Sequence, residues 1–113
     1  MKNKSKEEEI VSARDRNNFR QTKAWKDFRA FCKKLCGGKD YLTGSRLTAK
    51  FNLHHLDQRH EHYKDIEDPD RFICLNQQSH DAIHWLYRIW IKDPNVLDRI
   101  EEVLNRMKEY SND

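Results

Sequence analysis

The sequence has little of what membrane, secreted or disulfide-rich proteins need. No apolar run approaches the roughly 20 residues that span a bilayer. The N-terminal segment MKNKSKEEE carries charge but no apolar signal core. The chain has 3 cysteines, and an odd count without a secretory signal argues against a disulfide framework. These absences predict a cytoplasmic protein that does not associate with membranes.

The composition nevertheless predicts a folded domain. Hydrophobic and charged residues each make up 36% of the 113 residues, but 3 Trp, 4 Tyr and 5 Phe can supply a core. A chain of this length fits one modest domain. We expect residues 1–18 to form a flexible charged arm with at most a short helical segment, and residues 19–113 to form a single domain.

Positive charge is concentrated in the first third of the chain. Residues 1–40 contain 12 Lys or Arg and 6 Asp or Glu, whereas residues 41–113 contain 10 and 13. A basic segment can be an electrostatic footprint for nucleic acid. Ordinary solvated charge is the alternative, and composition alone favours it.

Helical periodicity appears on both sides of the central region. Residues 22–36 begin at a suitable N-cap, Thr22, and end before Gly37-Gly38, with Trp25, Phe28, Cys32 and Leu35 on one apolar face. In this helix Cys32 and Cys36 lie one turn apart, as small buried hydrophobes or, alternatively, as part of a metal site. Residues 94–109 follow Asp93-Pro94 and are expected to bury Val96, Leu97, Ile100, Val103, Leu104 and Met107.

Shorter elements are expected between these two helices. A turn at 43–45 precedes a strand over 47–53, and the polar segment 57–70 is a long exposed loop anchored by Tyr63 and Ile66. A second strand is predicted over 71–75. The next helix is predicted over 80–92, with Ser79 as its N-cap.

Four of the 6 histidines lie in two short clusters, N-L-H-H-L-D and S-H-D-A-I-H. His80 and His84 are four residues apart, so a helix places them on one face, where two imidazoles can bind one divalent metal. A strand points His54 and His55 to opposite sides, so one can join the metal while the other is left for acid–base chemistry. Hydrolysis of a phosphodiester needs both an activated water and a cation at the phosphate. A helical H-x-x-x-H alone is common and uninformative. The prediction depends on the order of strand, histidine pair, polar loop, strand and helix with H-x-x-x-H.

This order of strand, histidine pair, polar loop, strand and helix resembles the HNH endonucleases and their ββα-metal motif, over about residues 39–90. The resemblance implies an α+β fold with a core over 39–92, flanked by an N-terminal and a C-terminal helix. It implies DNA nicking or double-strand cleavage with one divalent cation, Mg²⁺, Mn²⁺, Ni²⁺ or Zn²⁺. Carried onto this sequence, His54, His80 and His84 would hold the metal and His55 would activate water.

Two departures from the family pattern follow from the sequence. Many members carry two C-x-x-C pairs that bind a structural zinc, and the corresponding positions here are Asp40, Thr43, Asn76 and Ser79. We therefore expect no zinc ribbon and a core held by apolar packing. The asparagine of the family name falls near Asp70 or Arg71, so Asn76 is retained only as a supporting residue beside the site.

Several basic residues are candidates for contacts with the DNA backbone, which would position DNA without reading its sequence. Ordinary solvation is the alternative for each of them. His60 and His62 in the polar loop could contact a phosphate or a metal, but solvation is the better interpretation for these two. The candidates are Arg59, Lys64, Arg71 and Arg88, with Lys26, Arg29 and Lys33 on the first helix and the neighbouring Lys23 and Lys34.

Two other classes of function stay open at this stage. One is a catalytically weak or inactive HNH-like module that grips nucleic acid around a structural metal. The other is a phage accessory protein with a packaging or replication partner, contacted through the amphipathic last helix. A stand-alone enzyme of phage type would act in the host cytoplasm as a monomer or weak dimer.

Overall fold

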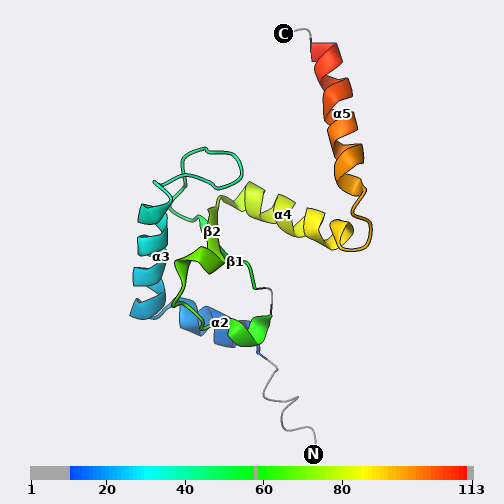
Figure 1. The fold of residues 1–113 in the computed structure, drawn as a ribbon. Coiled ribbons are helices and arrows are strands. Elements are labelled where there is room, and N and C mark those ends of the chain that lie inside the picture. Colours follow the sequence, from blue (N-terminus) through cyan, green and yellow to red (C-terminus); the bar gives the residue numbers. More distant parts are fainter. Residues whose placement is uncertain (1–10, 58, 112–113) are drawn as a thin grey trace, which may run out of the picture. The chain divides into compact units, whose positions relative to one another are not determined.

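The computed structural model describes residues 11–57 and 59–111, and it combines helices with a small antiparallel sheet, the mixed α and β composition that the sequence predicts (Figure 1). Of the described helices, none has both the length and the apolar composition needed to cross a membrane. The elements in chain order are α2 (Ala13–Arg20), α3 (Lys23–Leu35), β1 (Asn52–His55), η1 (His60–His62), η2 (Pro69–Arg71), β2 (Phe72–Leu75), α4 (Gln77–Trp90) and α5 (Val96–Ser111).

Helix α2 occupies part of the segment for which the sequence predicts a flexible arm. Ser12 and Asp15 form a reciprocal capping box at its start, which satisfies two N–H groups that the helix leaves open. The centre of the Phe19 ring lies 5.9 Å from that of Trp25 and 5.6 Å from that of Tyr63. Residues 13–18 are therefore helical, whereas residues 1–10 of the predicted arm lie outside the described residues.

Helix α3 confirms the first predicted helix within one residue at each end. The Thr22 hydroxyl accepts a hydrogen bond from the Trp25 amide, as an N-cap does. Gly37 and Gly38 follow the helix with positive φ, a conformation that glycine adopts at little cost. One residue of the predicted apolar face, Leu35, is instead 60% exposed.

The first strand is later and shorter than the predicted strand over 47–53. Leu47 and Phe51 are buried, but the chain between them turns, and the Phe51 amide donates to the Thr48 carbonyl. The Arg29 side chain of α3 donates to the carbonyls of Ala49 and Phe51. These carbonyls are therefore bonded to a side chain, and the strand begins only at Asn52.

The two strands pair antiparallel, with His54 opposite Ile73 and His55 opposite Phe72. Helix α3 packs against β2, as Figure 1 shows. The core between them is formed by Cys32, Leu47, Phe51 and Cys74, with Phe28, Cys36 and Leu53 around it. This small core agrees with the low hydrophobic content of the chain.

The polar segment between the strands contains two short 3₁₀ turns, η1 and η2, where the sequence predicts a loop with at most one helical turn. Tyr63 and Ile66, the predicted anchors, are half-buried. The Asp68 carboxylate accepts the Asp70 amide and so caps η2, which leads directly into β2.

Helix α4 begins at Gln77, three residues before the predicted start, and ends at Trp90 rather than residue 92. Ser79 is therefore not the N-cap. It is buried in the first helical turn, and its side chain hydrogen bonds to the Asp40 carboxylate. The predicted N-cap is wrong because the Ser79 hydroxyl bonds to Asp40, a residue distant in the sequence, and not to the start of its own helix.

The chain divides into two compact units between Ser79 and His80, inside the continuous helix α4. The single domain predicted over 19–113 stays a prediction. In the second unit, the Asp93 carboxylate accepts the Asn95 amide and pairs with Arg99, so α5 starts at Val96, two residues after the predicted start.

Helix α5 is more exposed than its sequence pattern predicts. Val96 is buried and Ile100 is half-buried, but four residues expected in the core are 46% to 60% exposed. Amphipathic spacing identifies a face that can be buried, and it does not say whether anything covers that face. The four exposed residues are Leu97, Val103, Leu104 and Met107.

Candidate metal centre

The structure brings together the three histidines that the sequence selects as metal ligands. One ring nitrogen from each of His54, His80 and His84 lies within 4.8 Å of the other two. His54 lies on β1, and the other two lie on successive turns of α4. Nitrogens bound to one metal at about 2.1 Å are at most about 4.2 Å apart, close to the spacing found here. These residues lie close enough to hold a metal ion.

The two helical histidines are arranged as neighbours on one face. Their ring centres are 4.5 Å apart in an edge-to-face contact. An oxygen of Asp81 lies 3.6 Å from Nδ1 of His80. Burial lowers the pKa of His84, and His80 and Arg88 lower it further. A neutral imidazole is the form that binds a metal.

His55, the predicted base, follows His54 on β1 and stacks on Phe72. Their ring centres are 4.3 Å apart with an angle of 12° between the planes. Burial lowers the pKa of His55, although the nearby carboxylates of Asp57 and Asp65 act in the opposite direction. The imidazole is therefore neutral at pH 7 and able to accept a proton.

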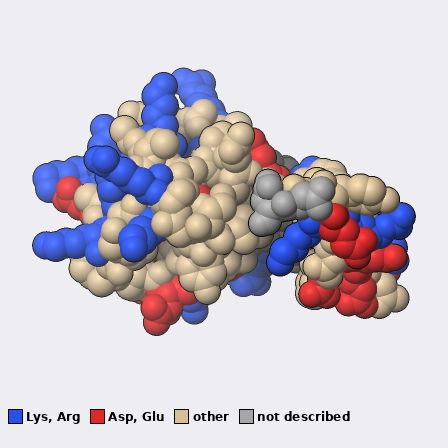
Figure 2. Space-filling view, turned by 90° about the horizontal axis from the view of Figure 1, so that it is seen from above, with Lys and Arg blue, Asp and Glu red and all other residues tan. Residues whose placement is uncertain are grey.

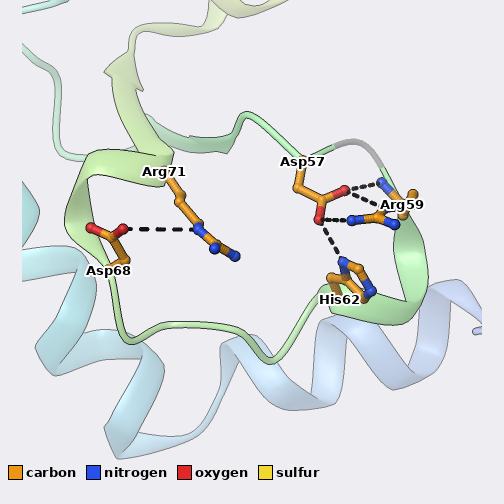
Figure 3. Close-up of polar contacts among 5 residues, drawn as sticks. All are labelled: Asp57, Arg59, His62, Asp68 and Arg71. Carbon is orange, nitrogen blue, oxygen red and sulfur yellow. Dashed lines mark hydrogen bonds and ion pairs between the residues drawn. The ribbon is translucent and has the colours of Figure 1, made fainter.

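The loop after β1 places a carboxylate that the sequence analysis did not select. Asp57 accepts two contacts from the Arg59 guanidinium at 3.0 Å and one from Nδ1 of His62 at 2.5 Å, as Figure 3 shows. The hydrogen bonds from Arg59 and His62 hold the pKa of Asp57 well below its usual range. His62 is thus engaged by Asp57. The side chain of His60 lies outside the described residues.

Arg29, predicted to contact phosphate, has internal partners instead. Its guanidinium donates to two carbonyls of the segment before β1 and lies 3.7 Å from the centre of the Phe51 ring. On the same helix, Lys26 and Lys33 are exposed, and Lys23 pairs with Asp27. Figure 2 shows Lys and Arg side chains in several separate groups on the visible face.

The other residues predicted to contact phosphate differ in their neighbours within the protein. Arg71 lies 3.9 Å from Asp68, and both side chains are exposed (Figure 3). Lys64 lies 5.5 Å from the centre of the Tyr63 ring. Arg88 is in the last turn of α4 and exposed. Phosphate binding by any of these residues stays a prediction.

The four positions that correspond to the family's zinc cysteines form a hydrogen-bonded cluster. The Asp40 carboxylate accepts the Thr43 and Asn76 amides and the Ser79 side chain. The Asn76 side chain in turn accepts the Thr48 amide and donates to the Arg46 carbonyl. Apolar packing is therefore not the only support of this region. An aspartate that begins a D-Y-L-T-G turn was the available sequence signal for it.

The three cysteines are free thiols and line a cavity of about 310 Å³ together with Leu56 and Phe72. Burial raises the pKa of Cys32 to about 11 and that of Cys74 to about 12. Both thiols are therefore protonated at neutral pH, whereas metal ligation needs the thiolate. This favours the interpretation of these cysteines as buried hydrophobic side chains.

Comparison of the chain with models of protein families, with curated proteins and with solved structures finds no match.

Proposed function

We propose that this protein is a metal-dependent endonuclease of the HNH type that hydrolyses phosphodiester bonds in DNA. The observation that carries the proposal is the group of His54, His80 and His84, whose ring nitrogens lie within 4.8 Å of one another. The order of antiparallel strands β1 and β2 followed by α4 supports an HNH core around this group. Three protein ligands leave open positions for water and a phosphate oxygen.

His55 is the residue to which we assign the base. It is adjacent to a ligand on the same strand, and alternation along a strand directs it to the other side of the sheet. In the hydrolysis, His55 takes a proton from water and the water oxygen bonds to phosphorus. The bond to the sugar oxygen breaks, and this oxygen leaves with the electron pair and takes a proton from solvent water. Stacking on Phe72 fixes the plane of the imidazole for this transfer.

His54, His80 and His84 would hold one divalent cation, Mg²⁺, Mn²⁺, Ni²⁺ or Zn²⁺. When bound, such a cation supplies positive charge for the phosphate and the leaving oxygen. The nitrogen-only ligand set favours Zn²⁺ or Ni²⁺ over Mg²⁺, because Mg²⁺ prefers oxygen ligands. A preference for Zn²⁺ or Ni²⁺ over Mg²⁺ would therefore support the proposed ligands.

Plasmid cleavage tests this proposal. Supercoiled DNA is incubated with the wild type in EDTA or with each of the four cations, and with His54→Ala as the variant that lacks one ligand. We expect relaxed or linear DNA with at least one cation, none in EDTA, and a large loss in His54→Ala. Cleavage that persists in EDTA, or that His54→Ala leaves unchanged, would contradict the proposal.

A second candidate is an HNH-like module that holds a structural metal and binds a partner without cutting DNA. The exposed apolar residues of α5, including Leu104 and Met107, favour it, because an isolated nuclease core does not need them. The engagement of Asn76 in structural hydrogen bonds also leaves the usual asparagine role of the family unfilled. Tight metal binding without cleavage in any condition would favour this candidate.

A further inference from the structure

Asp40 is a buried side chain that accepts several hydrogen bonds and that the proposed chemistry does not use. It is 2% exposed, and its Oδ1 accepts the amides of Leu42 and Thr43 at 2.8 and 2.9 Å. Its Oδ2 accepts the Asn76 amide at 2.8 Å, and the Ser79 side chain adds a further hydrogen bond. One buried carboxylate thus joins segments 36 residues apart.

The charge of Asp40 is stabilised by these donors. Burial by itself raises the pKa of a carboxyl group, but here the hydrogen bonds from Asn76, Thr43, Ser79 and Leu42 outweigh it and hold the pKa at about 2. The group is therefore ionised at neutral pH. Hydrogen bonds to an ionised acceptor are stronger than those between neutral groups.

The same residues lead directly into the metal centre. Asn76 connects β2 to α4, and Ser79 is in the first turn of α4, immediately before His80. The Asn76 side chain is held in addition by the Thr48 amide and the Arg46 carbonyl, at 2.8 and 2.9 Å. The first turn of α4 is therefore held to the segments around Asp40 and Arg46 by polar contacts.

We propose that Asp40 is the positioning residue of the metal centre, and that its buried carboxylate holds the Asn76–Ser79 turn so that His80 meets the metal already oriented. The inference rests on the proposed metal centre. Preorganised ligands bind a metal more tightly, because less ordering has to occur on binding. Asp40 itself touches neither the metal nor the DNA.

The test measures metal affinity by competition with a chromophoric chelator, using Zn²⁺ and Ni²⁺. Asp40→Asn keeps the size of the side chain but removes its charge, and it should weaken binding by about 10- to 100-fold. Asp68→Asn is the matched control, because Asp68 also accepts a backbone amide but its side chain is 53% exposed. The control should bind as the wild type does.

Ser79→Ala keeps the test valid if Asp40→Asn does not fold. It removes a single donor and leaves the carboxylate in place, and it should weaken binding by a smaller factor, about 3- to 10-fold. Hydrogen exchange of the metal-free protein supplies a readout that general destabilisation would not give. Exchange should speed up at Asn76 and in the first turns of α4 and remain unchanged in α3.

The outcomes separate the inference from the metal centre. If the wild type binds metal and His80→Ala does not, wild-type affinity in Asp40→Asn and Ser79→Ala would overturn the inference alone. Faster exchange in α3 and α4 alike would also overturn it, because Asp40 would then support the whole fold. If neither cation binds the wild type, both the metal centre and the inference are wrong.

Discussion

The guanidinium group of Arg29 lies 3.7 Å from the centre of the Phe51 ring and donates a 2.6 Å hydrogen bond to the carbonyl oxygen of the same residue. This pair ties α3 to the segment that enters β1, the strand of the histidine pair. Burial lowers the pKa of Arg29, which shows that its charge is partly removed from water. The Arg29 cation therefore bonds to groups within the protein.

Arg29→Ala should destabilise the protein by about 2 kcal/mol, because it removes a cation–π contact and two hydrogen bonds from a charged donor. Lys26→Ala, on an exposed site of the same helix, should change the free energy of unfolding by less than about 0.5 kcal/mol. Urea unfolding measures both. Equal stability of the two variants, with DNA binding lost only in Arg29→Ala, would instead support the phosphate contact predicted from the sequence.

Acid should remove the stabilisation that Asp40 provides. Its folded-state pKa of about 2 lies below the ordinary value of 3.8, so the stabilising contribution is full above pH 3.8 and is lost as the pH falls toward 2. The difference in urea midpoint between wild type and Asp40→Asn should therefore be constant near neutrality and shrink between about pH 4 and pH 2. The comparison with Asp40→Asn isolates this group from Asp57 and Asp93, whose pKa values are also lowered. A difference independent of pH would show that folding does not change the pKa of Asp40, and a difference that grows toward pH 2 would show that folding raises it.

Metal should stabilise the folded protein through the three histidines. At a free cation concentration of 100 times Kd, binding contributes about 2.7 kcal/mol, enough to raise Tm by several degrees. His84→Ala should lose this shift. His62→Ala is the matched control, because that histidine contacts Asp57 and is not a member of the metal group. Thermal unfolding with and without Zn²⁺ measures the effect, and equal shifts in His84→Ala and the wild type would exclude His84 as a ligand.

The exposed face of α5 should tolerate a charge. Leu104 is 58% exposed, so Leu104→Lys is expected to change the free energy of unfolding by less than about 0.5 kcal/mol. A loss above about 2 kcal/mol that depends on protein concentration would show that Leu104 is buried in an oligomer. Analytical ultracentrifugation of both proteins distinguishes the two cases.

Local signals in the sequence were sufficient for part of the fold and of the site. Thr22 and the glycine pair define α3 because caps and stops act over a few residues. The spacing of His80 and His84 needs only a helix to place them on one face. His54 lies on the strand that pairs with β2, and β2 leads into this helix, so His54 comes close to the other two histidines.

The predictions from the sequence are wrong where residues distant in the chain determine the local structure. Ser79 has the chemistry of an N-cap, but Asp40 takes its hydroxyl from far along the chain. The apolar alternation around Leu47 resembles a strand, yet Arg29 bonds the carbonyls that a strand would have used. Nothing local distinguishes a basic residue that contacts DNA from one that stacks on Phe51.

The most direct test of the central claim is the rate of plasmid cleavage by His55→Ala, with metal content measured on the same sample. We predict that metal occupancy equals that of the wild type while the rate falls by about 100-fold or more, because a general base typically contributes 10²- to 10⁴-fold. Cleavage by metal-loaded His55→Ala at the wild-type rate would contradict the assignment of His55 as the base and the mechanism built on it.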